Sequence, residues 1–199
     1  MFGSLTNAIS GSPWAYAIIF AIAFLDSFFP FVPSETVVIT GGVLAAGGHL
    51  SIELVLLAAA TGAFAGDNFT YGLGKVFGER LSDKLFRGPR AQRSLKWVEG
   101  LLRERGAALI IGARFIPGGR TATTFTCGLT GYPWRRFVLI TLIAGTVWAL
   151  YAGLLGYLGG TTFKDQEWKG LLLALGIAGA VAITSELVRA VRSPKGARS

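Results

Sequence analysis

Five ionisable side chains lie within or beside the apolar stretches of this sequence, and they are the residues most able to do chemistry there. Three carry carboxyl groups and two carry guanidinium groups: Asp26, Glu35, Asp67, Arg114 and Arg120. A charge at the centre of a membrane helix costs roughly 2.5–3.5 kcal/mol on insertion scales, so such residues usually pair and usually mark function. We therefore expect ion binding, proton transfer or both at these positions.

The two arginines bracket the sequence RFIPGGR. Pro117 removes a backbone donor, and Gly118 and Gly119 weaken helical order, so we expect a helix to break here. The break would leave free backbone N–H groups at the start of a half-helix, between two guanidinium groups. This combination suits a phosphate group, and it predicts a phosphate site made of Arg114, Arg120, Gly118 and Gly119. The alternative is that both arginines pair with acids and only hold the fold.

The carboxyl groups predict a second role, in proton coupling or gating. Glu35 follows Ser34, so it can lie in the first turn of a half-helix that Ser34 caps. Asp26 lies at the other arm of the same break. Burial in a dehydrated cavity favours the protonated form of a carboxyl group, so Asp26 and Glu35 could exchange protons. The alternative is salt bridging to the arginines, and both can hold if the pairs alternate.

Asp67 lies within GDNFTYGLG, in the middle of a long apolar stretch. We assign it to the same proton-coupling or gating group. The alternative is a helix-packing hydrogen bond made alongside Asn68 and Thr70.

No catalytic residue, metal site or cofactor is expected elsewhere. The single histidine, His49, is distant in the expected topology from the serines and threonines, so no nucleophile with a nearby base can be assembled. One histidine also rules out a multi-histidine metal site. The single cysteine, Cys127, lies in an apolar stretch and forms no disulfide framework. We therefore expect a protein that is not an enzyme.

The elements that position these residues are apolar enough for a membrane. Of 199 residues, 52% are hydrophobic and only 15% are charged, whereas soluble domains carry about 25% charged residues. The net charge is +8. Basic residues gather in 79–105 and at the C-terminus, which favours cytoplasmic loops and anionic lipid headgroups over nucleic acid. The sequence predicts one all-α polytopic membrane domain over residues 1–199.

Hydrophobicity and helix breakers divide this domain into spans and re-entrant hairpins. The hairpins are predicted where Pro and Gly interrupt apolar stretches too short to span comfortably. Both termini are placed in the cytoplasm by the positive-inside rule. The segments are a first span at 14–26, a re-entrant hairpin at 27–48, a span at 52–77, a cytoplasmic amphipathic segment at 79–105 broken at Gly88 and Pro89, a second re-entrant hairpin at 107–130, a span at 134–160, a last span at 169–190 and a cytoplasmic tail at 191–199.

The two broken segments, with the spans that follow them, form a weak internal repeat. FVPSETVVITGG and FIPGGRTATTFTCG both place a proline two residues after a phenylalanine, followed by polar and small residues. The first unit would enter the membrane from outside and the second from inside, so the repeat would be inverted. Transporters with inverted repeats bind their substrates near the midplane of broken elements. The predicted fold is an inverted repeat of re-entrant hairpin plus transmembrane helix, with extra flanking transmembrane helices.

Several motifs resemble those of the DedA family, also called the SNARE-associated or VTT-domain family. In order, they are FLDSFFPFVPSE, GDNFTYGLGKVFG, RFIPGGRTATTFTCGLTGYPWRRF and GTVWAL, within residues 24–160. The resemblance implies facing re-entrant hairpins, lipid scrambling or flipping, and a bacterial inner-membrane location. It places the family's acidic pair, arginine pair and Gly-Asp step on Asp26 and Glu35, Arg114 and Arg120, and Gly66 and Asp67. The two acids are closer together here than in the family pattern, and the second is Glu.

Together the residues and the resemblance predict a translocase for anionic lipid phosphates, with proton coupling part of the mechanism. The resemblance implies undecaprenyl phosphate as the favoured substrate. Expected partners are polyprenyl phosphate or phospholipid and protons, but not nucleic acid, and a homo-oligomer is compatible with the sequence. The main alternative is a proton- or cation-coupled transporter of a small solute. An enzyme acting on lipid phosphates and a non-transporting assembly factor are further alternatives.

Overall fold

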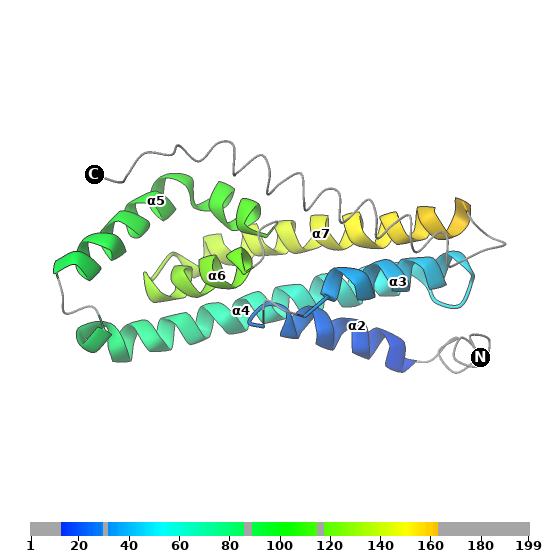
Figure 1. Cartoon of the computed structure of the whole chain (residues 1–199), viewed down its shortest axis with the longest axis horizontal. Helices are drawn as coiled ribbons and strands as arrows, with labels where there is room; N and C mark the ends of the chain where they lie inside the picture. The colour runs from blue at the N-terminus through cyan, green and yellow to red at the C-terminus, as the bar shows by residue number, and fades with distance from the viewer. Residues whose placement is uncertain (1–12, 30–31, 86–88, 115–117, 163–199) are drawn as a thin grey trace, which may run out of the picture.

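The computed structural model describes residues 13–29, 32–85, 89–114 and 118–162, and describes side chains throughout these ranges except within 79–95 (Figure 1). These residues form helices and no strand, which confirms the all-helical prediction. The predicted last span at 169–190 and tail at 191–199 lie outside the described residues. In chain order the helices are α2 (Pro13–Leu25), α3 (Ser34–Ala46), α4 (Ile52–Leu85), α5 (Pro89–Ala113), α6 (Gly119–Leu129) and α7 (Trp134–Thr162).

Two of the described helices are long and apolar enough to cross a membrane. Their candidate spans are Ile52–Gly78 in α4, with 27 residues, and Trp134–Thr162 in α7, with 29. At 1.5 Å per residue, each exceeds the ~30 Å hydrocarbon core of a bilayer. The predicted spans at 52–77 and 134–160 fall on these helices. The predicted span at 14–26 falls on α2, whose 13 residues extend roughly 20 Å.

Helix α4 continues past the apolar stretch, as far as Leu85. Residues 78–85, GERLSDKL, contain good helix formers and no proline, so the change in charge there does not end the helix. Helix α5 begins at Pro89, where the missing N–H is not needed for a helical hydrogen bond. Arg105 is non-helical (φ −131°, ψ 22°) and divides α5 into a polar first part and an apolar stretch at 106–113.

Each predicted break lies between two helices. The first joins α2 to α3, and the second joins α5 to α6 (Figure 1). Among the described residues of the predicted hairpin at 27–48 there is only one helix, α3, because no proline interrupts 34–46. The arm that faces α3 across the first break is therefore α2. The re-entrant character of the breaks stays a prediction.

Each short helix after a break packs along a long helix from the other half of the chain. Helix α3 lies along α7, and α6 lies along α4 (Figure 1). A Cβ added to Gly156 of α7 would overlap the carbonyl oxygen of Ile39, and one added to Gly128 of α6 would overlap that of Tyr71. Such close crossings through small residues are typical of membrane helices. This reciprocal packing is what an internal repeat requires, and its inversion across the membrane stays a prediction.

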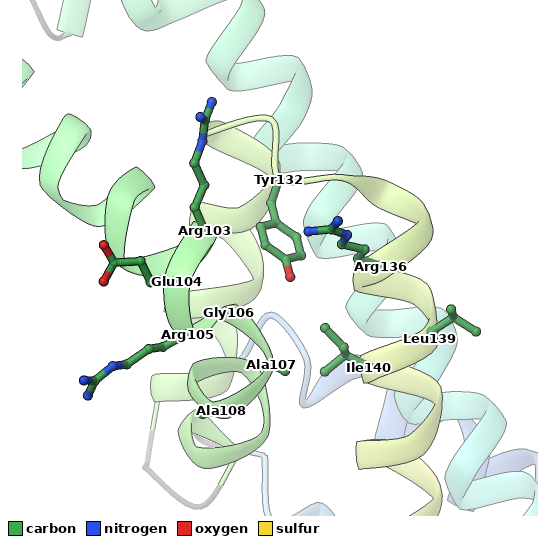
Figure 2. Close-up of a pocket in the computed structure, with 10 residues that line it drawn as sticks. All are labelled: Arg103, Glu104, Arg105, Gly106, Ala107, Ala108, Tyr132, Arg136, Leu139 and Ile140. Carbon is green, nitrogen blue, oxygen red and sulfur yellow. The ribbon is translucent and has the colours of Figure 1, made fainter.

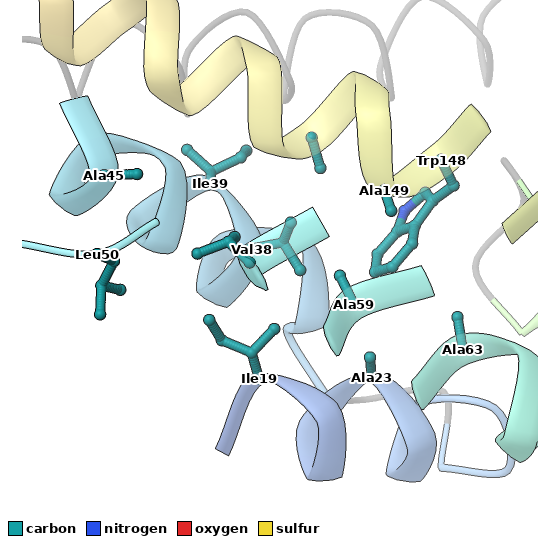
Figure 3. Close-up of a cluster of buried hydrophobic side chains, with 12 residues drawn as sticks. Ile19, Ala23, Val38, Ile39, Ala45, Leu50, Ala59, Ala63, Trp148 and Ala149 are labelled. Carbon is teal, nitrogen blue, oxygen red and sulfur yellow. The ribbon is translucent and has the colours of Figure 1, made fainter. Parts of the chain in front are cut away.

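Two apolar clusters flank the middle of α4. The larger one joins α2, α3, α4 and α7 and includes Val38, Ile39 and Trp148 (Figure 3). The smaller one joins α4, α5, α6 and α7, and the rings of Tyr71 and Phe137 stack in it with centroids 4.7 Å apart. The stretch of α4 between the clusters carries Gly66 and Asp67, so the fold places a polar position between two dry ones.

Candidate functional site

Four of the five predicted ionisable residues meet at the middle of α4. The Nε atom of Arg120 lies 2.7 Å from Oδ1 of Asp67, and Nη1 of Arg114 lies 2.8 Å from its Oδ2. Arg120 Nη1 also lies 3.0 Å from Oδ2 of Asp26. An acid of the first break, both arginines of the second break and the acid of α4 therefore form one cluster, hereafter the charge cluster.

Asp67 is the centre of the charge cluster. It is fully buried, one helical turn after Ala63 and one turn before Tyr71, which belong to the two apolar clusters. Of its neighbours in α4, Thr70 bonds to the segment after α2, whereas Asn68 bonds back within α4. Asn68 Nδ2 donates to the carbonyl of Phe64 at 2.9 Å, and the Thr70 hydroxyl donates to the carbonyl of Ser27 at 3.3 Å. Asp67 itself binds arginines.

Arg120 uses its guanidinium group to join three helical regions. Besides the two acids, its Nη2 donates to the Ser27 hydroxyl and, at 3.0 Å, to the carbonyl of Ala63. The side chain is only 9% exposed, so these contacts replace water. The sequence analysis did not predict these two neutral acceptors. Ser27 could have been noticed as a polar residue beside Asp26 in an apolar stretch, but a backbone carbonyl cannot be predicted from residue types.

The start of α6 positions Arg120 as the glycines predicted. Gly118 adopts a left-handed conformation (φ 70°), which a side chain would strain, and α6 begins at the next residue, Gly119. Arg120 thus lies in the first helical turn, where backbone N–H groups lack intrahelical acceptors. Residues 115–117, including the predicted breaker Pro117, lie outside the described residues.

The Arg114 side chain is buried, but only one of its three guanidinium nitrogens is hydrogen-bonded within the described part of the chain. Its side chain is 3% exposed, and it donates to Asp67 through Nη1. Its Nε and Nη2 atoms are buried and have no hydrogen-bond partner among the described residues. Nη2 faces Gly145 of α7, where an added Cβ would lie 3.4 Å away. An unsatisfied buried donor costs about 1–3 kcal/mol, so these two nitrogens are the donors of the charge cluster most able to take up a further acceptor.

The first break is held closed by a hydrogen bond between its arms. Ser34 was expected to cap α3, and that expectation is wrong. Pro33 occupies the N-cap position, no side chain caps the helix, and Ser34 is its first residue. The Ser34 hydroxyl instead donates to Oδ2 of Asp26 at 2.8 Å. Asp26 therefore joins the first break to Arg120 and to α3 at once.

Glu35 lies beside the charge cluster without joining it. It is half-buried in the first turn of α3, as predicted, but it has no ion pair or hydrogen bond among the described residues. Its electrostatic neighbours are Asp26 and Tyr151 of α7. The hydroxyl of Tyr151 is buried and also unpartnered within the described part of the chain. The alternative for Glu35, a salt bridge to the arginines, is not seen among the described residues.

The sequence and this geometry can be set beside known proteins. The VTT domain matches residues 32–158, which include Glu35, Asp67 and both arginines of the charge cluster but not Asp26. Protein DedA of Escherichia coli (strain K12) is 30% identical over 197 residues, covering 92% of this chain and 85% of that protein. The chain belongs to the DedA family of VTT-domain proteins.

Other relatives of this DedA-family chain are also bacterial proteins. Inner membrane protein YohD of E. coli (strain K12) is 32% identical over 126 residues, covering 63% of this chain and 64% of that protein. Undecaprenyl phosphate transporter A of Bacillus subtilis (strain 168) is 28% identical over 141 residues, covering 68% of this chain and 69% of that protein. No solved structure matches the chain. The resemblance is confirmed, and the chain is a membrane protein with apolar helices α4 and α7.

Proposed function

We propose that this DedA-family protein moves anionic lipid phosphates across the plasma membrane of a bacterium, with undecaprenyl phosphate the favoured substrate. One observation carries the proposal. Arg114 is buried beside Arg120, yet two of its guanidinium nitrogens have no partner among the described residues. The name of the B. subtilis relative, undecaprenyl phosphate transporter A, supports the same class of substrate.

The two unpartnered nitrogens have the geometry that phosphate needs. Nε and Nη2 form one edge of the planar guanidinium fork, so they can donate two parallel hydrogen bonds to two oxygens of one phosphate. The third nitrogen of Arg114 stays on Asp67 at 2.8 Å and holds the fork in place. The first-turn N–H groups after Gly118 would complete the site.

Charge balance indicates which acid a phosphate would displace and why protons would move with it. Asp26 and Asp67 offset Arg114 and Arg120, so an arriving phosphate brings surplus negative charge into a dry region. Asp67 is fully buried, whereas the Asp26 side chain is 20% exposed, so Asp26 is the acid that phosphate can displace from Arg120. Proton uptake by Asp26 or Glu35 would offset the surplus, which couples lipid movement to protons.

The lipid tail would stay in the bilayer while the phosphate passes the charge cluster, without covalent chemistry. His49 follows the C-terminal end of α3, whereas Glu35 lies in its first turn. The 13 residues of α3 therefore put roughly 20 Å between the one histidine and the first break. This distance favours transport over hydrolysis of the lipid phosphate.

A second candidate is a proton- or cation-coupled transporter of a small solute. It is favoured by Glu35, an acid that lies near Asp26 and makes no ion pair among the described residues. Such a transporter would use the same acids and would produce solute-driven proton flux in vesicles that hold no lipid phosphate.

The membrane arrangement is part of the proposal. We infer that the two breaks are re-entrant, that the two halves are inverted repeats and that both termini face the cytoplasm. The reciprocal packing of α3 on α7 and of α6 on α4 supports the repeat. Cysteine labelling of residues added at each terminus, from each side of sealed vesicles, tests the orientation.

The test of function separates binding from folding. Arg114→Lys keeps a cation for Asp67 but removes the fork, since an ammonium group is a single point of charge. In reconstituted vesicles we expect flipping of a polyprenyl phosphate to fall at least about tenfold, with little change in the thermal midpoint. Arg135→Lys is the control, because Arg135 is exposed at the start of α7.

Two outcomes would contradict the proposed phosphate site. One is wild-type flipping by both Arg114→Lys and a folded Arg120→Ala variant. The other is equal transport of a polyprenyl phosphate and an ordinary zwitterionic phospholipid, with and without a pH gradient. The solute alternative is tested in the same vesicles, by measuring proton flux on addition of candidate solutes.

A further inference from the structure

Two cavities open where the polar part of α5 meets the start of α7, and Figure 2 shows the residues that line the first. No residue of the charge cluster lines either cavity. They have volumes of about 550 and 570 Å³. Both are lined by the same three side chains, Arg103 of α5, Tyr132 of the turn before α7, and Arg136 of the first turn of α7. Cavities of several hundred Å³ are the size that holds a small organic ligand.

The kink in α5 creates this site. Arg105 is non-helical, and the next residue, Gly106, packs directly on the ring of Tyr132, where an added Cβ would lie 2.8 Å from the ring. In Figure 2, the Tyr132 ring fills the space between α5 and α7, and Arg136 reaches toward it from α7. Tyr132 is buried and lines both cavities.

The side chains that line the two cavities carry more positive than negative charge. The first cavity is lined by Arg103, Arg105 and Arg136 and by one acid, Glu104, and in Figure 2 the Glu104 and Arg105 side chains both extend away from Tyr132 and Arg136. In the second cavity the acid is Glu99, which pairs with Arg103 at 3.1 Å in an exposed i,i+4 pair. Arg136 has no ion pair among the described residues, and it lies at the positive end of the α7 dipole. An anion is the ligand that these charges favour.

The floor of the first cavity is apolar. Ala107, Ala108, Leu139 and Ile140 line it below the arginines. From Leu139 an exposed apolar strip runs along α7, because Ile143 and Val147 follow at four-residue spacing on the same face.

Exposed tryptophans mark the same end of the molecule. Trp97 of α5 and Trp134 of α7 are both exposed, and exposed tryptophans are typical of the level of lipid headgroups. A pocket of arginines at headgroup level that meets an apolar strip is complementary to a lipid that is anionic at one end and apolar along its length.

We propose that these cavities form a second lipid site, which binds the phosphate headgroup of an anionic membrane lipid between Arg103 and Arg136 while an acyl chain lies against Ala107, Leu139 and Ile143. The site is separate from the charge cluster. It binds lipid at equilibrium, so the proposal holds whether or not the protein transports lipid.

The experiment measures the association of lipids with the full chain in phosphatidylcholine vesicles. Spin-labelled phosphatidylglycerol and phosphatidylcholine with identical chains report the fraction of each lipid immobilised on the protein. We expect phosphatidylglycerol to be preferred, and Arg136→Gln to lower that preference roughly fivefold, as for the loss of one direct hydrogen-bonded contact with the phosphate. Arg135→Gln is the matched control, because it removes the same charge from the same turn and lines neither cavity. It should change the preference less than about twofold.

A second variant tests the cavity without changing charge. Ala107→Trp would fill the first cavity from its exposed wall, so we expect it to lower the phosphatidylglycerol preference while the thermal midpoint stays the same. Equal effects of Arg135→Gln and Arg136→Gln, or no effect of Ala107→Trp, would overturn the proposal in favour of general surface charge. Displacement of the lipid by inorganic phosphate, at matched ionic strength, would overturn the lipid assignment in favour of free phosphate.

Discussion

Arg120 of α6 and Asp67 of α4 form a 2.7 Å ion pair, although the two residues are 53 positions apart in the sequence. The pair is nearly dry, since the two side chains are 9% and 0% exposed. Buried ion pairs recover their desolvation cost only when further hydrogen bonds satisfy the remaining atoms. Ser27, Ala63 and Asp26 supply those bonds to Arg120. The pair is therefore one part of a wider hydrogen-bond network around Arg120.

Asp67→Asn should strongly destabilise the protein. It leaves two buried guanidinium groups without their shared carboxylate, and breaking a buried pair from one side costs roughly 3–5 kcal/mol. The measurement is the thermal unfolding midpoint in detergent. Glu99→Gln is the control, because its pair with Arg103 is exposed and such pairs contribute about 0–1 kcal/mol. Similar shifts in the two variants would contradict the network.

Asp26→Asn should affect transport more than stability. The Asp26 side chain is partly exposed, and the Asn amide can still accept the bond from Ser34, so the loss should be smaller than for Asp67→Asn. If Asp26 is the acid that phosphate displaces, its neutral form cannot take up a proton. We therefore expect flipping by Asp26→Asn to lose its dependence on a pH gradient. A gradient dependence equal to wild type would assign proton coupling elsewhere, with Glu35 the next residue to change.

Gly156→Ala should loosen the contact between α3 and α7. The new methyl group would overlap the carbonyl oxygen of Ile39, and a well-packed interior pays about 1–3 kcal/mol for such overpacking. Gly72→Ala is the matched control within α4. It meets no atom within 4 Å and should stabilise the helix by about 0.5–1 kcal/mol. The thermal midpoints should therefore move in opposite directions, and equal midpoints would contradict the close crossing.

Gly118→Ala should disturb the position of Arg120. Gly118 has φ 70°, and the left-handed conformation costs a residue with a side chain roughly 1–2 kcal/mol. The strain is relieved by moving the start of α6, so we expect flipping to fall further than the thermal midpoint alone explains. Gly112→Ala in α5, where an added Cβ meets nothing within 4 Å, should leave flipping unchanged. Full flipping by Gly118→Ala would show that the exact start of α6 is not required.

Local features of the sequence predicted the helices, the breaks and the charged residues. Pro and Gly stop helices through backbone geometry, so the breaks beside Asp26 and Arg120 could be predicted from the sequence without knowing the tertiary structure. The lengths of the apolar stretches in α4 and α7 could also be predicted, because hydrophobicity is a local property. The ends of the helices were harder to predict. Helix α4 continues to Leu85 through residues that are more charged but still favour a helix.

Only the tertiary structure decided which charges pair. Asp67 binds both arginines because glycines on α4, α6 and α7 let the helices approach closely enough to bring residues 47 and 53 positions apart into contact. Glu35, for which a salt bridge to the arginines was the alternative, has Asp26 and Tyr151 of α7 as its electrostatic neighbours instead. The Ala63 carbonyl and the cavity at Tyr132 carried no sequence signal, since a backbone acceptor and a kink acquire meaning only from what packs against them. Sequence alone determined which residues are costly to bury in a membrane, and the packing determined which of them share that cost.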